Sequence, residues 1–196
     1  MNTSTSSLSE MINSSIVVLT KPSIATFEQY ERRGTTRDAL IYVGAAAALA
    51  GLAGFIFGLL GGITGAIAGL LIGALVPLLG FVIFASVLFF LGKQLGGTGT
   101  QDEVFYTCAL YTAPLLAITG VVGAIPLLGC LLAPVTLLLG LYQLYLGYLA
   151  SRSSMNLNQN NAIISVIVAI IAQLVAGGII TFVVAAIFGT AASLNS

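Results

Sequence analysis

Long runs of apolar residues recur along this 196-residue chain and limit it to one class of fold. A helical run of about 20 residues matches the hydrocarbon core of a bilayer. A transmembrane β-barrel would instead show segments of about ten residues with alternating polarity. Only 6% of the residues are charged, whereas a soluble domain carries about 25%. The sequence therefore predicts an all-α, polytopic helical bundle that spans a membrane.

The apolar runs predict five membrane-spanning helices. Their expected bounds are 39–60, 63–91, 104–122, 127–149 and 162–188, within a membrane domain of residues 39–190. Pro77 divides the second run into residues 63–76 and 78–91, each shorter than the ~20 residues that a helix needs to cross. One kinked or tilted helix is therefore favoured, with a re-entrant pair as the alternative. Residues 1–15 are rich in Ser, Thr and Asn and predict a disordered tail.

Residues 16–38 predict a segment that lies on the cytoplasmic membrane surface. Pro22 suits the first turn of a helix, and Ile24 begins an apolar row at three-residue spacing. A short N-terminal amphipathic helix of this kind would rest on lipid headgroups, and a solvated charged linker is the alternative. The residues expected at this interface are aromatic or basic: Phe27, Tyr30, Arg32, Arg33 and Arg37.

The positions of the charges support five spans. With five, every basic residue falls on the N-terminal side of the membrane: Lys21, Arg32, Arg33, Arg37, Lys93 and Arg152. All six carboxylates fall there too, so none need lie at membrane depth. A six-span count would move Lys93 and Arg152 to the other side. The positive-inside rule then predicts a cytoplasmic N-terminus and a C-terminus that is outside or lumenal. We expect the membrane to be a plasma (inner) membrane, with the C-terminus outside.

Glycines repeat every four residues in the first two spans, so they line one face of each helix. The six positions are Gly54, Gly58, Gly62, Gly65, Gly69 and Gly73. Small residues at this spacing let helix backbones approach closely. The stripes predict packing between spans one and two, and a homo-oligomer interface is the alternative.

The later spans contain polar residues without charge. Thr112, Gln143 and Gln173 lie inside the apolar runs, and the two glutamines lie at similar distances from the loop between spans four and five. We expect the two amides to form a hydrogen-bonded pair. Tyr145, Tyr148 and Arg152 close the fourth span, where aromatic rings and a snorkelling arginine favour the headgroup level.

The sequence argues against an enzyme and against nucleic-acid binding. There is no histidine, no carboxylate inside a span and no Gly-Lys-Ser/Thr phosphate loop, so we predict no catalytic, metal or cofactor site. Cys108 and Cys130 both sit in apolar runs and are interpreted as small hydrophobic residues. The formal net charge is zero and no basic block occurs, which excludes a nucleic-acid partner.

Three segments resemble one known family. The segment before the membrane, KPSIATFEQYERR, carries Pro22, Thr26, Phe27 and Glu28. The loop before the third span and the span itself, TGTQDEVFYTCALYTAPLL, carry Gly99, Tyr106, Tyr111 and Pro114. The fourth span and the loop after it carry Tyr142, Tyr145, Tyr148 and Ala162. Over residues 20–190 the sequence resembles the bacterial branch of the Yip family of Rab/Ypt-interacting membrane proteins. The resemblance implies five spans and a role in membrane organisation, traffic or shaping. The Asp-Leu-Tyr-Gly-Pro segment of eukaryotic members is missing, so Rab binding is not carried over.

We therefore predict a non-enzymatic membrane scaffold that acts through helix packing and contact with membrane lipids, with no protein partner identified. The alternative is a small translocator of a lipid or uncharged solute that uses the third and fourth spans, which contain Pro114 and Pro134. A continuous polar cavity lined by Thr112, Gln143 and Gln173 would favour the translocator. A dry core packed by the glycine stripes would favour the scaffold.

Overall fold

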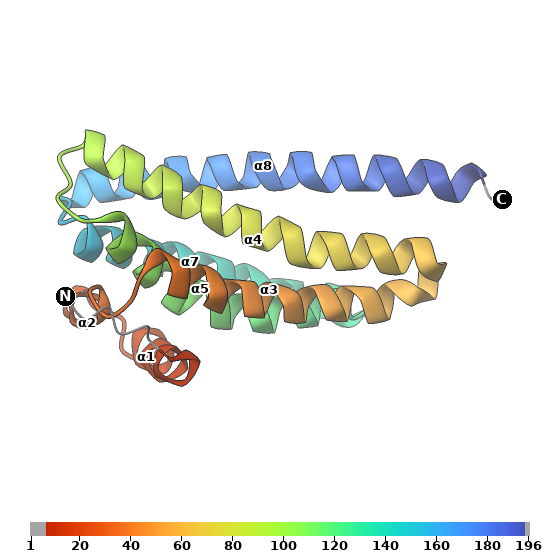
Figure 1. The fold of residues 1–196 in the computed structure, drawn as a ribbon, viewed down its shortest axis with the longest axis horizontal. Coiled ribbons are helices and arrows are strands. Elements are labelled where there is room, and N and C mark those ends of the chain that lie inside the picture. The colour runs from red at the N-terminus through yellow and green to blue at the C-terminus, as the bar shows by residue number, and fades with distance from the viewer. Residues whose placement is uncertain (1–6, 195–196) are drawn as a thin grey trace.

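The computed structural model describes residues 7–194 of the chain, with side chains to residue 188. Within that range the regular secondary structure is helical throughout (Figure 1). In chain order the elements are α1 (Leu8–Thr20), α2 (Ile24–Tyr30), α3 (Thr36–Gly58), η1 (Leu59–Gly61), α4 (Gly62–Gln94), α5 (Gln101–Ala124), α6 (Leu128–Leu131), α7 (Ala133–Ser154) and α8 (Gln159–Leu194).

Four stretches of the described chain are long and apolar enough to cross a membrane, and the first folds back on itself. That stretch, Thr36–Gln94, has 59 residues. A straight helix of this length would extend about 90 Å. Instead η1 reverses the chain, Gly62 adopts a φ of 79°, and α4 returns along α3 (Figure 1). The predicted all-α membrane bundle is confirmed, with α3, α4, α5, α7 and α8 as its long helices. Pro77 lies inside the continuous α4, so the second run forms one helix.

Side-chain caps fix where α3 and α5 begin. The Thr35 hydroxyl accepts from the Asp38 N–H while the Asp38 carboxylate accepts from the Thr35 N–H. Thr100 and Glu103 form the same reciprocal pair at the start of α5. Each pair satisfies donors that the first turn of a helix otherwise leaves unbonded. The first turns of α3 and α5 lie at the same end of the bundle, where Thr36 donates to Asp102.

The fourth long helix begins later and ends later than predicted. The sequence predicted a span over residues 127–149, whereas α7 covers Ala133–Ser154. Leu127 has a φ of 66°, which interrupts the helical path before the short α6. Pro134 then lies in the first turn of α7, where its missing N–H costs no hydrogen bond. It starts the helix and does not break it.

The prediction of a disordered tail over residues 1–15 is wrong for residues 8–15, which belong to α1; residues 1–6 lie outside the described part of the chain. Ser7 and Glu10 form a capping box at the start of α1. Its side chains at 11, 14, 15 and 18 share one face and are buried. Residues 16–38 also differ from the single helix expected, because they contain the end of α1 and the separate α2.

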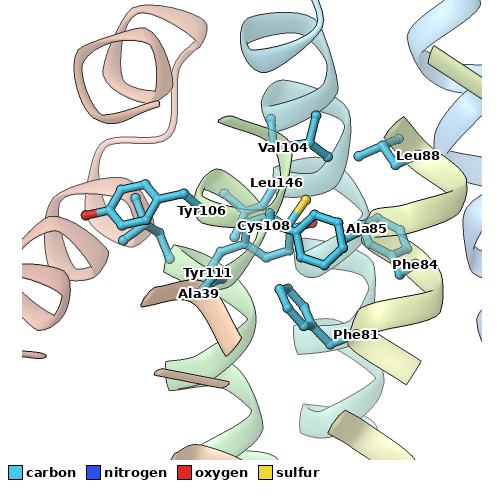
Figure 2. Close-up of a cluster of buried hydrophobic side chains, with 14 of the residues drawn as sticks. Ala39, Phe81, Phe84, Ala85, Leu88, Val104, Tyr106, Cys108, Tyr111 and Leu146 are labelled. Carbon is cyan, nitrogen blue, oxygen red and sulfur yellow. The ribbon is translucent and has the colours of Figure 1, made fainter. Parts of the chain in front are cut away.

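Packing is concentrated in one half of the bundle. The charged end is defined here as the α2–α3, α4–α5 and α7–α8 loops with the adjoining helix turns; the apolar end holds η1 and α6. Every residue from 104 to 113 of α5 is buried, and seven of the nine residues 146–154 of α7 are buried. None of residues 133–145 of α7 is buried. The core therefore lies toward the charged end, where α3, α4, α5 and α7 contribute the side chains labelled in Figure 2.

Candidate functional site at the charged end

A cleft of about 770 Å³ opens at the charged end between α1, the α2–α3 loop and the start of α5. A ligand site typically has a volume of about 300–1,000 Å³. The charged residues of its lining are Glu10, Glu31, Arg32, Arg33, Asp102 and Glu103. Four carboxylates and two guanidinium groups thus share one polar hollow beside the membrane-spanning helices.

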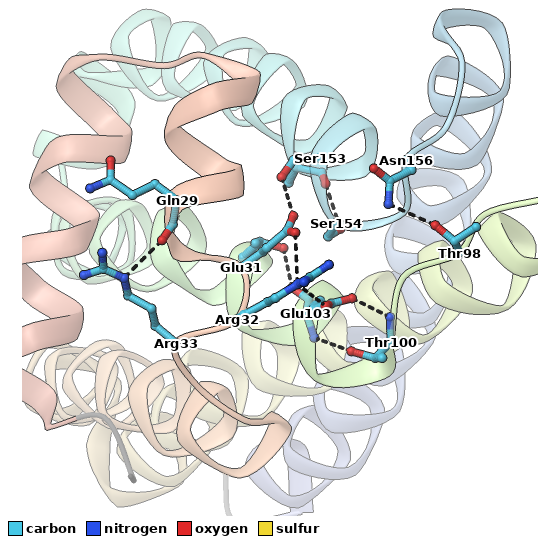
Figure 3. Close-up of polar contacts among 12 residues, drawn as sticks. Gln29, Glu31, Arg32, Arg33, Thr98, Thr100, Glu103, Ser153, Ser154 and Asn156 are labelled. Atoms are coloured by element: carbon cyan, nitrogen blue, oxygen red, sulfur yellow. Dashed lines mark hydrogen bonds and ion pairs between the residues drawn. The ribbon is translucent and has the colours of Figure 1, made fainter. Parts of the chain in front are cut away.

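Glu31 is the buried centre of this charge cluster, with 8% of its surface exposed. Ser153 Oγ at the end of α7 donates a 2.7 Å hydrogen bond to Glu31 Oε2 (Figure 3). Arg32 Nε lies 3.0 Å from Glu103 Oε1 and 3.6 Å from Glu31 Oε1. Arg32 itself is exposed, so its ion pairs contribute little stability. The cluster joins the α2–α3 loop, α5 and α7.

Burial raises the pKa of the Glu31 carboxyl above its ordinary value of 4.5. The Ser153 hydrogen bond and the Arg32 charge act to lower this pKa, while the nearby Glu103 and Glu28 carboxylates act to raise it. Desolvation is the largest of these effects because it disfavours the ionised form. Glu31 therefore holds a proton more readily than a carboxyl in water does.

Backbone and side-chain hydrogen bonds tie the loops of the charged end together. Thr36 donates from its N–H and its hydroxyl to Asp102 Oδ1 at 2.7 and 2.6 Å. Asn156 Nδ2 donates to Thr98 Oγ1 at 2.9 Å, which joins the α7–α8 and α4–α5 loops (Figure 3). These contacts hold the ends of several long helices in fixed relative positions.

The predicted interfacial residues do not share one membrane-facing surface. Phe27 is fully buried and its ring packs edge-on against Tyr111, with centroids 6.3 Å apart, so its predicted contact with lipid headgroups is wrong. Tyr30 is 8% exposed, and Arg33 stacks over its ring at 4.8 Å. Three-residue spacing correctly placed these rings on one face, but α2 turns that face toward α5 and α7.

The basic residues and the later tyrosines lie nearer to their expected places. Arg37 is exposed in the first turn of α3. Tyr145 is 47% exposed on α7. Arg152 Nη1 donates a 3.0 Å hydrogen bond to the Tyr148 hydroxyl one turn away. A role for these residues at the headgroup level stays a prediction.

The glycine stripes face each other inside the chain. A Cβ added at Gly54 or Gly69 would overlap the carbonyl oxygen of the other residue, and Gly58 and Gly65 are paired in the same way. Gly73 approaches Ala50, while Gly62 forms the turn. The stripes therefore allow α3 and α4 to touch backbone to backbone, and a second copy of the chain would need a different surface.

The two glutamines line one cavity but do not bond to each other. Gln143 and Gln173 border a cavity of about 130 Å³ with Phe84 and Gly140. No hydrogen bond joins the two amides, so the predicted pair is not formed in the described structure. Thr112 is buried in α5 and does not line this cavity. The cavity and the charged cleft share no lining residue.

Sequence reasoning missed the Glu31 cluster and α1. Glu31 and Ser153 are 122 positions apart, so no local pattern relates them. The Ser-x-x-Glu spacing of residues 7–10 was the available signal for α1. Among the described residues, no group of three or more His, Cys, Asp or Glu side chains could hold a metal ion.

Comparison with known proteins agrees with the fold. No curated protein and no solved structure matches the chain. The model of the Yip1 domain matches residues 16–180, which is most of the chain and includes the described structure from the middle of α1 into α8. This multi-pass membrane protein belongs to the Yip family.

Proposed function

We propose that the protein is a non-enzymatic scaffold that shapes or organises a plasma (inner) membrane, with its charged end in the cytoplasm. The positive charges concentrated at that end support this orientation. Contact with lipid and packing between helices would supply the activity, so no reacting residue is needed.

The asymmetric packing of the bundle carries this proposal. In the half near the charged end, α1 and α2 pack against α5 and α7 and enlarge the cross-section of the protein. In the other half, α7 has no buried residue before Leu146, and after Ala169 of α8 only Val184 is buried among the residues with described side chains. A protein that is wider in one leaflet displaces more lipid there, which favours bending of the membrane.

The small cavity is the feature that favours the alternative, a translocator of a lipid or uncharged solute. Its two amides could hold a neutral polar group near the middle of the membrane. Among the described residues, this cavity and the charged cleft have no lining residue in common. The scaffold therefore fits the described geometry better.

Reconstitution into preformed liposomes tests both functions on one sample. Vesicle diameter, solute flux and lipid scrambling are measured as protein is added. Cys130 is exposed near the apolar end and Cys108 is buried, so a membrane-impermeant thiol reagent reports the fraction of molecules inserted each way. With an excess of molecules whose charged end lies in the outer leaflet, we expect smaller vesicles and no flux. Flux without a change in diameter would favour the translocator, and no change in either would contradict both functions.

A further inference from the structure

A row of exposed apolar side chains follows one side of α1. Leu8, Ile12 and Ile16 are 47%, 49% and 55% exposed. A four-residue step turns about 40° around a helix, so the three side chains fall within an arc of about 80°. The buried side chains, including Met11 and Val18, point to a different side, against the bundle. Within the described part of the chain, about half of each of these apolar side chains is left uncovered.

Hydrogen bonds hold α1 beside the long helices, at a position displaced from the charged end toward the apolar end. Ser15 Oγ lies 3.1 Å from the Tyr42 hydroxyl, and the Tyr142 hydroxyl donates a 2.6 Å bond to the Leu19 carbonyl. Tyr42 is six residues after the start of α3 and Tyr142 is twelve residues before the end of α7. These steps correspond to about 9 and 18 Å along the helices. Along the bundle axis, α1 therefore lies at the same depth as the apolar surfaces of the long helices.

An exposed apolar residue of a membrane-spanning helix lies next to the tyrosine that bonds to α1. Ile41, next to Tyr42 on the membrane-spanning α3, is 48% exposed. Glu10 and Asn13, on a different side of α1 from the apolar row, line the charged cleft. The helix thus has a protein side, a polar side and an apolar side, which is the pattern of a helix that lies in a bilayer interface.

We propose that Leu8, Ile12 and Ile16 insert among the lipid chains of the leaflet at the charged end, with the polar side of α1 toward water. The bilayer is the occupant that the position of α1 favours, because the helix is bonded to membrane-spanning helices at the level of their apolar surfaces. This contact goes beyond the proposed shaping function, since it needs no bending of the membrane.

A single tryptophan tests the contact, because the chain contains none. Ile12→Trp places the probe in the apolar row, and the matched control Asn13→Trp places it about 100° away on the polar side. Each variant is reconstituted into vesicles with or without phospholipids brominated on their acyl chains, and aqueous acrylamide is the opposing quencher. In Ile12→Trp we expect emission at shorter wavelength than in the control, loss of most emission in brominated vesicles and weak quenching by acrylamide.

Other patterns would overturn the proposal. Quenching of Ile12→Trp by acrylamide and not by brominated lipid would place the row in water. Equal lipid quenching of both variants would show that the apolar row does not define the membrane side. In a Cys130→Ser background, continued protection of Cys108 from a thiol reagent checks that each variant is folded. Ile16→Trp repeats the measurement if Ile12→Trp exposes that thiol. The tryptophan measurement does not depend on vesicle diameter. A result against insertion of the apolar row is therefore distinct from a result against the shaping function.

Discussion

Replacing Gly54 by alanine would insert a methyl group where the backbones of α3 and α4 touch. The new Cβ would lie 2.8 Å from the carbonyl carbon of Gly69 and would overlap its oxygen. Ordinary contacts of this kind begin at 3.4 Å, so the helices would have to separate by at least 0.6 Å (3.4 minus 2.8). Both partners are backbone atoms, which cannot rotate away as a flexible side chain could.

The cost follows from that separation. A gap of about 0.5–1 Å forfeits roughly a quarter to a half of the dispersion attraction between the atoms concerned. Overpacking of this kind typically costs about 1–3 kcal/mol. Alanine also gains about 0.8–1 kcal/mol over glycine in helix propensity. Gly44→Ala on the same helix supplies the same propensity gain, and a Cβ there meets nothing within 4 Å. The difference between the two variants therefore isolates the overpacking, and we expect Gly54→Ala to be less stable by about 1–3 kcal/mol.

The buried thiol of Cys108 provides the assay once exposed Cys130 is replaced by serine. Unfolding is driven by SDS in mixed micelles, and a short pulse of thiol reagent at each SDS fraction measures the exposed Cys108. We expect the midpoint to rise or stay unchanged in Gly44→Ala and to fall in Gly54→Ala. Equal midpoints in the two variants would refute the close backbone contact of α3 and α4.

Three further predictions concern other parts of the molecule. Phe27→Ala removes the ring that packs on Tyr111 and should destabilise the fold by about 3–5 kcal/mol, seen as faster labelling of Cys108 in the Cys130→Ser background; an unchanged rate would contradict docking of α2. Because burial raises the pKa of the Glu31 carboxyl, the folded protein favours the protonated form of this residue. The stability that this form contributes is fully present below pH 4.5 and is lost as the pH rises through the raised pKa. Glu31→Gln should flatten this pH dependence of the SDS midpoint, and an unchanged slope would assign it to another group. Gln143→Leu should leave liposome permeability unchanged, whereas a loss of flux would favour the translocator.

Long apolar runs and glycine spacing made the helical bundle and its first hairpin predictable. These signals are local, because they depend on the length of a run or on which residues share a helix face. Pro134 shows where local signals fail, since proline can start a helix or break one. The helical path before α7 is interrupted by the positive φ of Leu127, and no pattern in the sequence indicates this backbone conformation.

The sequence of a helix did not predict whether protein or lipid covers its apolar face. Phe27 and Tyr30 lie on one face, as their spacing indicated, but the sequence did not specify whether protein or lipid covers it. The structure gives that face to α5 and α7. In α1 the residues that looked too polar for a membrane segment, such as Ser14 and Ser15, are the ones that pack on the bundle. A serine can be buried there because a tyrosine hydroxyl is within hydrogen-bond reach.

The unpaired glutamines follow from the uneven packing along α7. Counting residues from the α7–α8 loop placed Gln143 and Gln173 at the same level, and both do border one cavity. Their pairing would require α7 and α8 to stay closely packed at that level, but burial on α7 begins only at Leu146. Toward the apolar end, residues 133–145 are therefore available to lipid while the amides keep an open space between them. The greater width of the charged end has a separate cause, because α1 and α2 pack there against α5 and α7.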